Sequence, residues 1–109
     1  MKTPLLANES IVKQGAANLQ RGLESVGGQL YLTNQRLVFE PHCFNIQRKV
    51  AAIPVSAITD VRTCWTKFLN LLPLFPNSIA VSTRTNQEYR LVVANRQSWV
   101  TAIANQRHG

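Results

Sequence analysis

Two neighbouring residues, His42 and Cys43, are the first side chains in this sequence that could do chemistry. A cysteine beside a histidine suggests a nucleophile and its base, but adjacent side chains on an extended chain point to opposite sides. Only folding could supply a group that orients the imidazole. The carboxylates are scattered, without a close pair for acid–base work: Glu9, Glu24, Glu40, Asp60 and Glu88. No glycine-rich phosphate loop is present, so we do not expect an enzyme or a catalytic residue.

The cysteines do not form a metal-binding pattern. Cys43 and Cys64 stand far apart, and together with two histidines they give no zinc spacing. We therefore expect two packing thiols, reduced in a cytosolic protein, with a single disulfide as the alternative. Neither a metal nor another cofactor is expected.

Positive charge is the strongest compositional signal. The chain has 109 residues with twelve Lys and Arg against five Asp and Glu, a net charge of +7. This charge favours anionic partners such as lipid headgroups, nucleic acid or acidic proteins. The candidates for a lipid-headgroup site lie in or near expected loops and strand ends: Lys13, Arg21, Arg48, Lys49 and Lys67. The simpler interpretation is a solvated basic surface, because the dense cluster of a tight phosphoinositide binder is absent. No RNA-binding consensus appears, so specific nucleic-acid binding is not expected.

An apolar stretch over residues 65–77 stands where a polar loop is expected between two strands. A short helical turn at 67–72 is one option, since Pro73 would stop it, and Pro73 and Pro76 disfavour a regular strand. Three interpretations stay open: the stretch covers the core, contacts a partner or second copy, or inserts into a bilayer interface. Its large apolar side chains are Trp65, Phe68, Leu69, Leu71, Leu72, Leu74 and Phe75.

The elements that must position these residues are mostly strands. Apolar and polar residues alternate in two hairpins, over 29–33 with 36–41 and over 78–83 with 88–93. Asn34 and Asn86 suit the left-handed backbone of their turns, and Gly27-Gly28 predicts a loop. Further strands are expected over 15–22, 47–53 and 57–65, whereas residues 9–14 are ambiguous between a helical turn and a strand.

The C-terminal segment changes to a helical period. Asn95 is a plausible N-cap, and Trp99, Ala102, Ile103 and Gln106 then fall on one face, which should dock on the sheet. We therefore expect one domain over residues 1–109, mainly β, with about seven antiparallel strands over about 15–93 forming a barrel or sandwich capped by one helix over about 95–107. The N-terminus lacks a signal-peptide core, and the longest apolar stretch is too short to span a bilayer. A soluble or surface-attached protein is expected.

Four segments in the right order resemble the GRAM domain family: residues 27–42 (GGQLYLTNQRLVFEPH), 53–61, 77–93 and 96–103. The resemblance implies a pleckstrin-homology-like fold, in a small stand-alone member of the bacterial type. The Thr33–Arg36 turn matches the family signature. We interpret Arg36 as a structural residue of this turn, with an exposed ligand contact as the alternative.

The resemblance implies function only loosely, because some family members bind anionic lipids and others contact proteins. We expect a non-catalytic binding module in peripheral contact with anionic membrane lipids, located in the cytoplasm or at the inner membrane surface. The alternative is a protein-interaction or homo-oligomerisation module that uses the apolar 65–75 segment.

Overall fold

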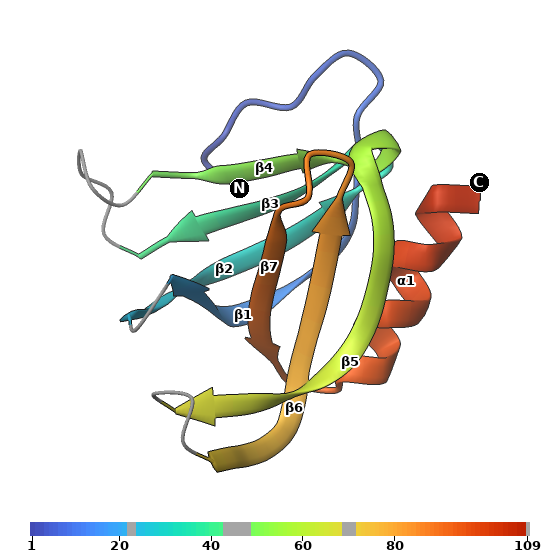
Figure 1. Cartoon of the computed structure of the whole chain (residues 1–109). Coiled ribbons are helices and arrows are strands. Elements are labelled where there is room, and N and C mark those ends of the chain that lie inside the picture. The colour runs from blue at the N-terminus through green and yellow to red at the C-terminus, as the bar shows by residue number, and fades with distance from the viewer. Residues whose placement is uncertain (22–23, 43–48, 69–71, 109) are drawn as a thin grey trace.

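Seven antiparallel strands and one C-terminal helix build the chain (Figure 1). The computed structural model describes residues 1–21, 24–42, 49–68 and 72–108, with the backbone alone for 65–68, 72–77 and 108. In chain order the elements are β1 (Ile11–Arg21), β2 (Glu24–Thr33), β3 (Arg36–Pro41), β4 (Ala51–Pro54), the 3-10 turn η1 (Val55–Ala57), β5 (Ile58–Phe68), β6 (Leu72–Thr83), β7 (Glu88–Val93) and α1 (Arg96–His108). The predicted mainly β fold class with a C-terminal helix is confirmed.

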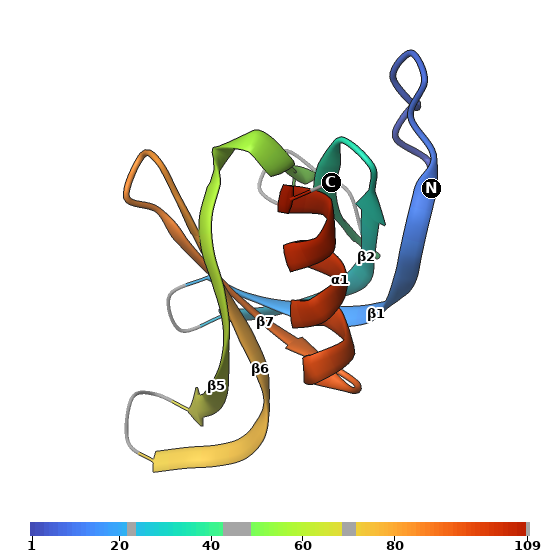
Figure 2. The same ribbon diagram turned by 90° about the vertical axis from the view of Figure 1, so that its right-hand side faces the viewer.

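The strands form one open sheet in the order β4-β3-β2-β1-β7-β6-β5. β1 to β4 cross β5 to β7, and the sheet curls so that its two halves face each other (Figure 1). Residues Ala17–Gln20 of β1 join the halves by pairing with β7. The helix α1 lies beside β5 and closes one side of the curl, as Figure 2 shows.

The core lies inside this curl and follows the period of two. Leu30 and Leu32 of β2 and Leu37 and Phe39 of β3 are buried, as the alternation predicts. From α1, Trp99 and Ile103 complete the same cluster, so the predicted docking face of the helix is confirmed.

Two local predictions were wrong, and one ambiguity is resolved. Gly27 and Gly28 lie inside β2 rather than in a loop, because a Cβ on Gly28 would stand 2.2 Å from the Glu40 carbonyl oxygen of the neighbouring strand. Asn34 does not adopt the left-handed backbone, and its side chain instead accepts from the Ser10 N–H and donates to the Asn8 carbonyl. Residues 11–14, left ambiguous by the sequence, belong to β1. At Asn86 the left-handed backbone is confirmed, with a φ of 63°.

The expected loop over residues 65–77 is also largely strand. β5 runs on to Phe68 and β6 begins at Leu72, so no helical turn covers residues 67, 68 or 72. Lys67 pairs opposite Pro73. The two prolines do disturb this hairpin, since the pairing register shifts on both sides of Thr66. Residues 69–71 lie outside the described residues.

The sheet ends at β5, and the helix covers this edge with two arginine side chains. Arg96 Nη1 donates to the Cys64 carbonyl at 2.9 Å, and Arg107 Nη2 donates to the Thr59 carbonyl at 2.8 Å. The helix starts one residue after the predicted position. Asn95 precedes it with a φ of 57°, and its carbonyl accepts from the N–H and hydroxyl of Ser98.

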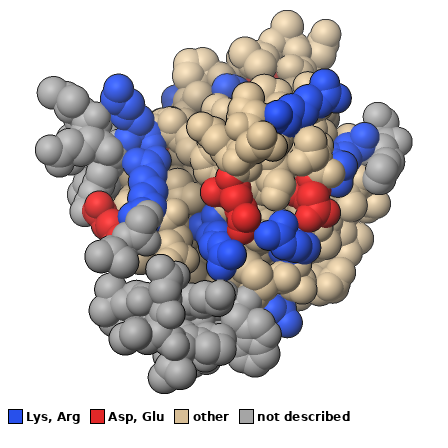
Figure 3. Space-filling view, in the orientation of Figure 1, with Lys and Arg blue, Asp and Glu red and all other residues tan. Residues whose placement is uncertain are grey.

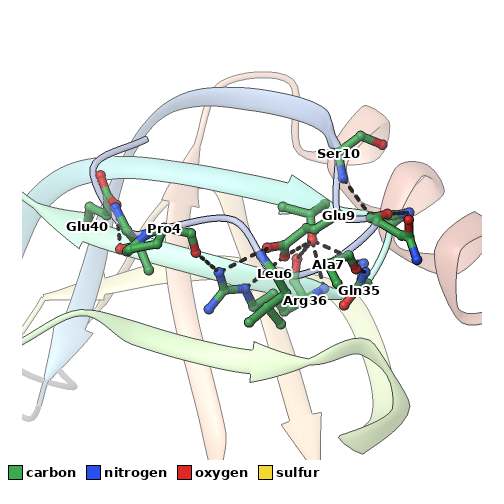
Figure 4. Close-up of polar contacts among 12 residues, drawn as sticks. Pro4, Leu6, Ala7, Glu9, Ser10, Gln35, Arg36 and Glu40 are labelled. Carbon is green, nitrogen blue, oxygen red and sulfur yellow. Dashed lines mark hydrogen bonds and ion pairs between the residues drawn. The ribbon is translucent and has the colours of Figure 1, made fainter.

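The first nine residues, here called the N-terminal arm, cross the outer face of β3. Thr3 donates to the Glu40 carboxylate from both its N–H and its hydroxyl, each at 2.6 Å, and Arg36 donates to the Pro4 carbonyl at 2.7 Å (Figure 4). Val38 lies between Arg36 and Glu40 on this outer face, yet it is fully buried. Val38 is therefore buried outside the main core cluster, on the face that the arm crosses.

Candidate functional site

The histidine and the cysteines considered for catalysis do not form a catalytic site among the described residues. His42 is exposed, Cys43 lies outside the described residues, and Cys64 is a half-buried free thiol whose pKa is raised by burial. Among the described residues, no three side chains of His, Cys, Asp or Glu lie together as a metal site would require.

Two of the acidic residues lie in an ion-pair network on the outer face of β5, β6 and β7. Arg62 contacts Asp60 and Glu88, each at 3.2 Å, and Arg90 contacts Glu88 at 3.0 Å. Figure 3 shows acidic and basic side chains side by side over β6 and β7. These side chains are more than a third exposed, so water screens the pairs and each contributes little to stability. Their charges offset one another, which leaves this face without a strong field.

Glu9 and Arg36 form an ion pair in which the Glu9 side chain is fully buried (Figure 4). Arg36 Nε donates to Glu9 Oε2 at 2.8 Å, and Arg36 Nη2 donates to Oε1 at 3.0 Å. Hydrogen bonds from Arg36 lower the pKa of Glu9 from 4.5 to about 2, against the burial that raises it; the Thr33 hydroxyl and the Leu6 N–H add to the lowering. The structural interpretation of Arg36 is thus confirmed. Sequence reasoning missed its partner, which lies 27 positions away.

Of the five predicted headgroup residues, the structure brings Arg21 and Lys49 together. Arg21 ends β1, and its Nη2 donates to the Lys49 carbonyl at 3.0 Å, just before β4 begins. Lys13 stands apart: it is eight positions from Arg21 along the same strand, or about 26 Å. Its Nζ lies 5.1 Å from the centre of the Trp99 ring, a cation–π distance. Lys13 and Arg21 therefore cannot bind one headgroup.

The remaining site predictions fall outside the described residues. Arg48 belongs to the segment 43–48, and the side chain of Lys67 is not described. The same holds for the side chains of the predicted membrane or partner contact, Trp65, Phe68, Leu69, Leu71, Leu72, Leu74 and Phe75. These two groups stay predictions.

Sequence reasoning did not predict which large hydrophobic residues would be exposed. Leu5, Leu6, Ile11 and Val12 are the exposed large hydrophobic residues of the described structure, with exposed fractions of 51%, 52%, 38% and 48%. The Leu5-Leu6 pair was visible in the sequence, but a short pair carries no periodic signal by which to predict exposure.

Comparison with known families settles the relationship of the chain. The model of the GRAM domain matches residues 1–98. The chain belongs to the GRAM domain family. Comparison of this GRAM domain with curated proteins found no match. No helix in the described ranges has both the length and the apolar character that crossing a membrane requires.

Solved structures show the same fold. The C-terminal domain of an unknown protein from Leishmania infantum superimposes with a TM-score of 0.78 at 20% identity, covering 94% of this GRAM domain and 88% of that chain. The N-terminal PH domain of human ARAP2 gives 0.64 at 19% identity, covering 87% and 77%. The DH/PH domains of PDZ-RhoGEF, solved in complex with activated RhoA, give 0.71 at 13% identity, covering 94% of this chain and 31% of that chain.

The fold is therefore of the pleckstrin-homology type. GRAM and PH-like domains are commonly lipid-binding or protein-binding modules and are generally non-catalytic. Identities this low establish the fold alone, so the ligand must be argued from the residues of this chain.

Proposed function

We propose that this GRAM domain is a non-catalytic binding module that attaches peripherally to anionic membrane lipids, at the inner surface of the cell membrane. The contact is made by the end of the sheet where β1 finishes and β4 begins. The observation that carries the proposal is the bond from Arg21 to the Lys49 carbonyl, which holds two cationic residues 28 positions apart in the sequence side by side.

Charge at this end supports an anionic surface as the ligand. Arg48 precedes Lys49 in sequence, whereas Glu24, opposite Arg21 in β2, is the nearby carboxylate. Figure 3 shows basic side chains at the left margin of the molecule, with an acidic side chain beside them, away from the balanced charges at its centre. At about 1 kcal/mol for each Lys or Arg near the bilayer, three cations give weak, salt-sensitive adhesion.

The β5–β6 hairpin offers an apolar contribution to the same surface. Figure 1 shows the ends of β1, β3 and β5 on one side of the molecule. The segment from β5 to β6 carries the seven large apolar residues predicted for membrane contact. Lys67 lies between two of them in the sequence. Apolar side chains beside cations suit insertion at the headgroup level, and they would add a component of binding that salt does not remove.

Vesicle sedimentation tests this proposal. The wild type should sediment with vesicles containing phosphatidylserine and not with phosphatidylcholine alone, and binding should fall as salt rises. Arg21→Glu with Lys49→Glu should reduce binding at least tenfold. For a control of equal charge change, Arg21→Glu alone is compared with Arg84→Glu, at an exposed position in the β6–β7 turn, and Arg21→Glu should weaken binding more. Equal sedimentation with neutral and anionic vesicles at low salt would refute the proposal.

A second candidate function uses the β5–β6 hairpin for protein contact. β7 pairs with β6 over Ser78–Ser82, so the part of the hairpin before Ser78 has no third described strand beside it. A two-stranded hairpin rich in apolar residues is only marginally stable in water and gains from a partner or a second copy. Leu71→Asp with Leu72→Asp should convert an oligomer to a monomer in light scattering. A wild-type monomer would rule out self-association here.

A further inference from the structure

One edge of the described sheet is open along the first half of β1. β7 pairs with β1 over Ala17–Gln20, and the chain then leaves the sheet at Asn95, which has a φ of 57°. No described strand therefore pairs with residues Ile11–Ala16 on the side away from β2, which we call the open β1 edge. Figure 2 shows this half of β1 at the right margin of the molecule, with no other ribbon beyond it.

The main chain of Gln14 faces the open β1 edge. The His42 N–H donates to the Gly27 carbonyl at 3.1 Å, so the main chain of Gly27 faces β3. Main-chain groups of successive residues in a strand point to alternate sides, so those of Leu30 face β1, where Leu30 pairs with Gly15. The N–H and C=O of Gln14, one position earlier in β1, then point away from β2. A second strand beside β1 would give both groups hydrogen-bond partners.

The two outer edges of the described sheet differ from the open β1 edge. Guanidinium groups of Arg96 and Arg107 occupy carbonyls along β5, and β4 has only four residues. A covered edge and a short edge are both protected from strand addition. The open β1 edge is therefore where a further strand can join this sheet.

Charge does not guard the open β1 edge. The side chains of Val12, Gln14 and Ala16 are exposed beside it and uncharged. Lys13 points to the opposite face of β1, where its Nζ lies 5.1 Å from the centre of the Trp99 ring. This charge already lies against an aromatic ring in the single chain, so pairing of β1 need not displace it.

The sequence of the open β1 edge is complementary to itself. In an antiparallel pair of two β1 strands centred on Gln14, Lys13 faces Gly15 of the second copy and Val12 faces Ala16 of the second copy. Each larger side chain then meets a smaller one, and no cation faces a cation. At the centre, the two Gln14 residues exchange main-chain hydrogen bonds, and each side-chain amide can both donate and accept. A second copy therefore fits this edge without a like-charge contact.

We propose that two copies of this GRAM domain associate through the open β1 edge, as an antiparallel β1–β1 pair centred on Gln14. The pair occupies the open edge of each copy, so association stops at two. The pairing register of β1 shifts between Ile11 and Lys13, which keeps the contact short and predicts a weak dimer. Gln14 and Arg21 lie seven positions apart, or about 23 Å along β1, so the inference uses residues separate from the proposed lipid contact.

Sedimentation equilibrium over a range of protein concentrations tests the proposal. The mass should rise from 12.2 kDa toward twice that value as the concentration rises. Each copy carries a net charge of +7, so salt should strengthen the dimer by screening the repulsion, whereas it should weaken the proposed lipid binding. A chain that stays monomeric up to about 1 mM at high salt would overturn the proposal.

Two variants of Gln14 locate the contact. Gln14→Glu places two carboxylates opposite each other at the centre of the pair and should weaken association at least tenfold, although it lowers the net positive charge. Gln87→Glu makes the same change at an exposed position of the β6–β7 turn and should not weaken association. Gln14→Pro removes the N–H that faces the open β1 edge while it spares the pairing with β2, and it should also weaken association at least tenfold.

Urea midpoints check that each variant is folded. A wild-type dimer that both Gln14 variants leave intact would contradict the proposal. A dimer that is lost instead in Leu71→Asp with Leu72→Asp would assign self-association to the β5–β6 hairpin, and the proposal would be wrong.

Discussion

Replacing Glu9 by Gln should destabilise the domain by an amount that depends on pH. The pKa of Glu9 falls from 4.5 to about 2 in the folded state. At about 1.4 kcal/mol for each pH unit, this difference corresponds to about 3 kcal/mol of stability for the ionised form. A folded-state pKa below the unfolded value contributes stability that is present above pH 4.5 and is lost as the pH falls toward 2. Because a glutamine cannot ionise, Glu9→Gln removes this contribution.

Urea denaturation from pH 7 to pH 2 measures the effect. The wild type should exceed Glu9→Gln by about 3 kcal/mol at pH 7, and the two curves should converge below about pH 2.5. Glu88→Gln is the matched control, since its ion pairs are exposed, and it should cost less than 1 kcal/mol. A difference between wild type and Glu9→Gln that stays constant from pH 7 to pH 2.5 would refute the assignment of the stability to the ionised pair.

Three further outcomes are expected. Gly28→Ala should prevent folding or cost more than about 3 kcal/mol in urea denaturation, because its Cβ would collide with the β3 backbone. The control Gly15→Ala, whose Cβ would stand 3.4 Å from Trp99, should cost far less. Equal losses of stability in the two variants would contradict the collision. Trp99→Ala should lower the free energy of unfolding by about 3–5 kcal/mol, because it leaves a cavity between α1 and the sheet. A loss below 1 kcal/mol would show that Trp99 does not anchor the helix on the sheet. In a Cys43→Ser variant, Cys64 should react with iodoacetamide at pH 8 more slowly than free cysteine, because burial raises its pKa; equal rates would contradict that burial.

Elements with a clear period were predictable from the sequence. Strict alternation around Leu30 and Leu37 located the first hairpin and its buried face, and the change to a helical period located Trp99 and Ile103. These signals are local, because a buried face imposes its spacing on each element separately. The left-handed backbone of Asn86 was also predictable, because turn preference is a local property of the residue.

Features that depend on distant partners were not predictable. A glycine pair usually marks a loop, but Gly28 lies in a strand because a neighbouring backbone approaches it closely. Asn34 makes its contacts with the N-terminal arm, so local turn preference did not decide its backbone. For the candidate site, the sequence named five cations, but only the folded chain shows that Arg21 meets Lys49 and that Lys13 lies elsewhere.

The contacts of Arg96 and Arg107 with the outer edge of β5 bear on how the protein behaves at high concentration. Unoccupied carbonyls on an edge strand act as a template on which chains stack into fibres. Here guanidinium groups from α1 occupy the carbonyls of Cys64 and Thr59. Local unwinding of the helix would uncover this template while the sheet stays intact. The rate of fibre formation should therefore follow the fraying of α1 rather than global unfolding.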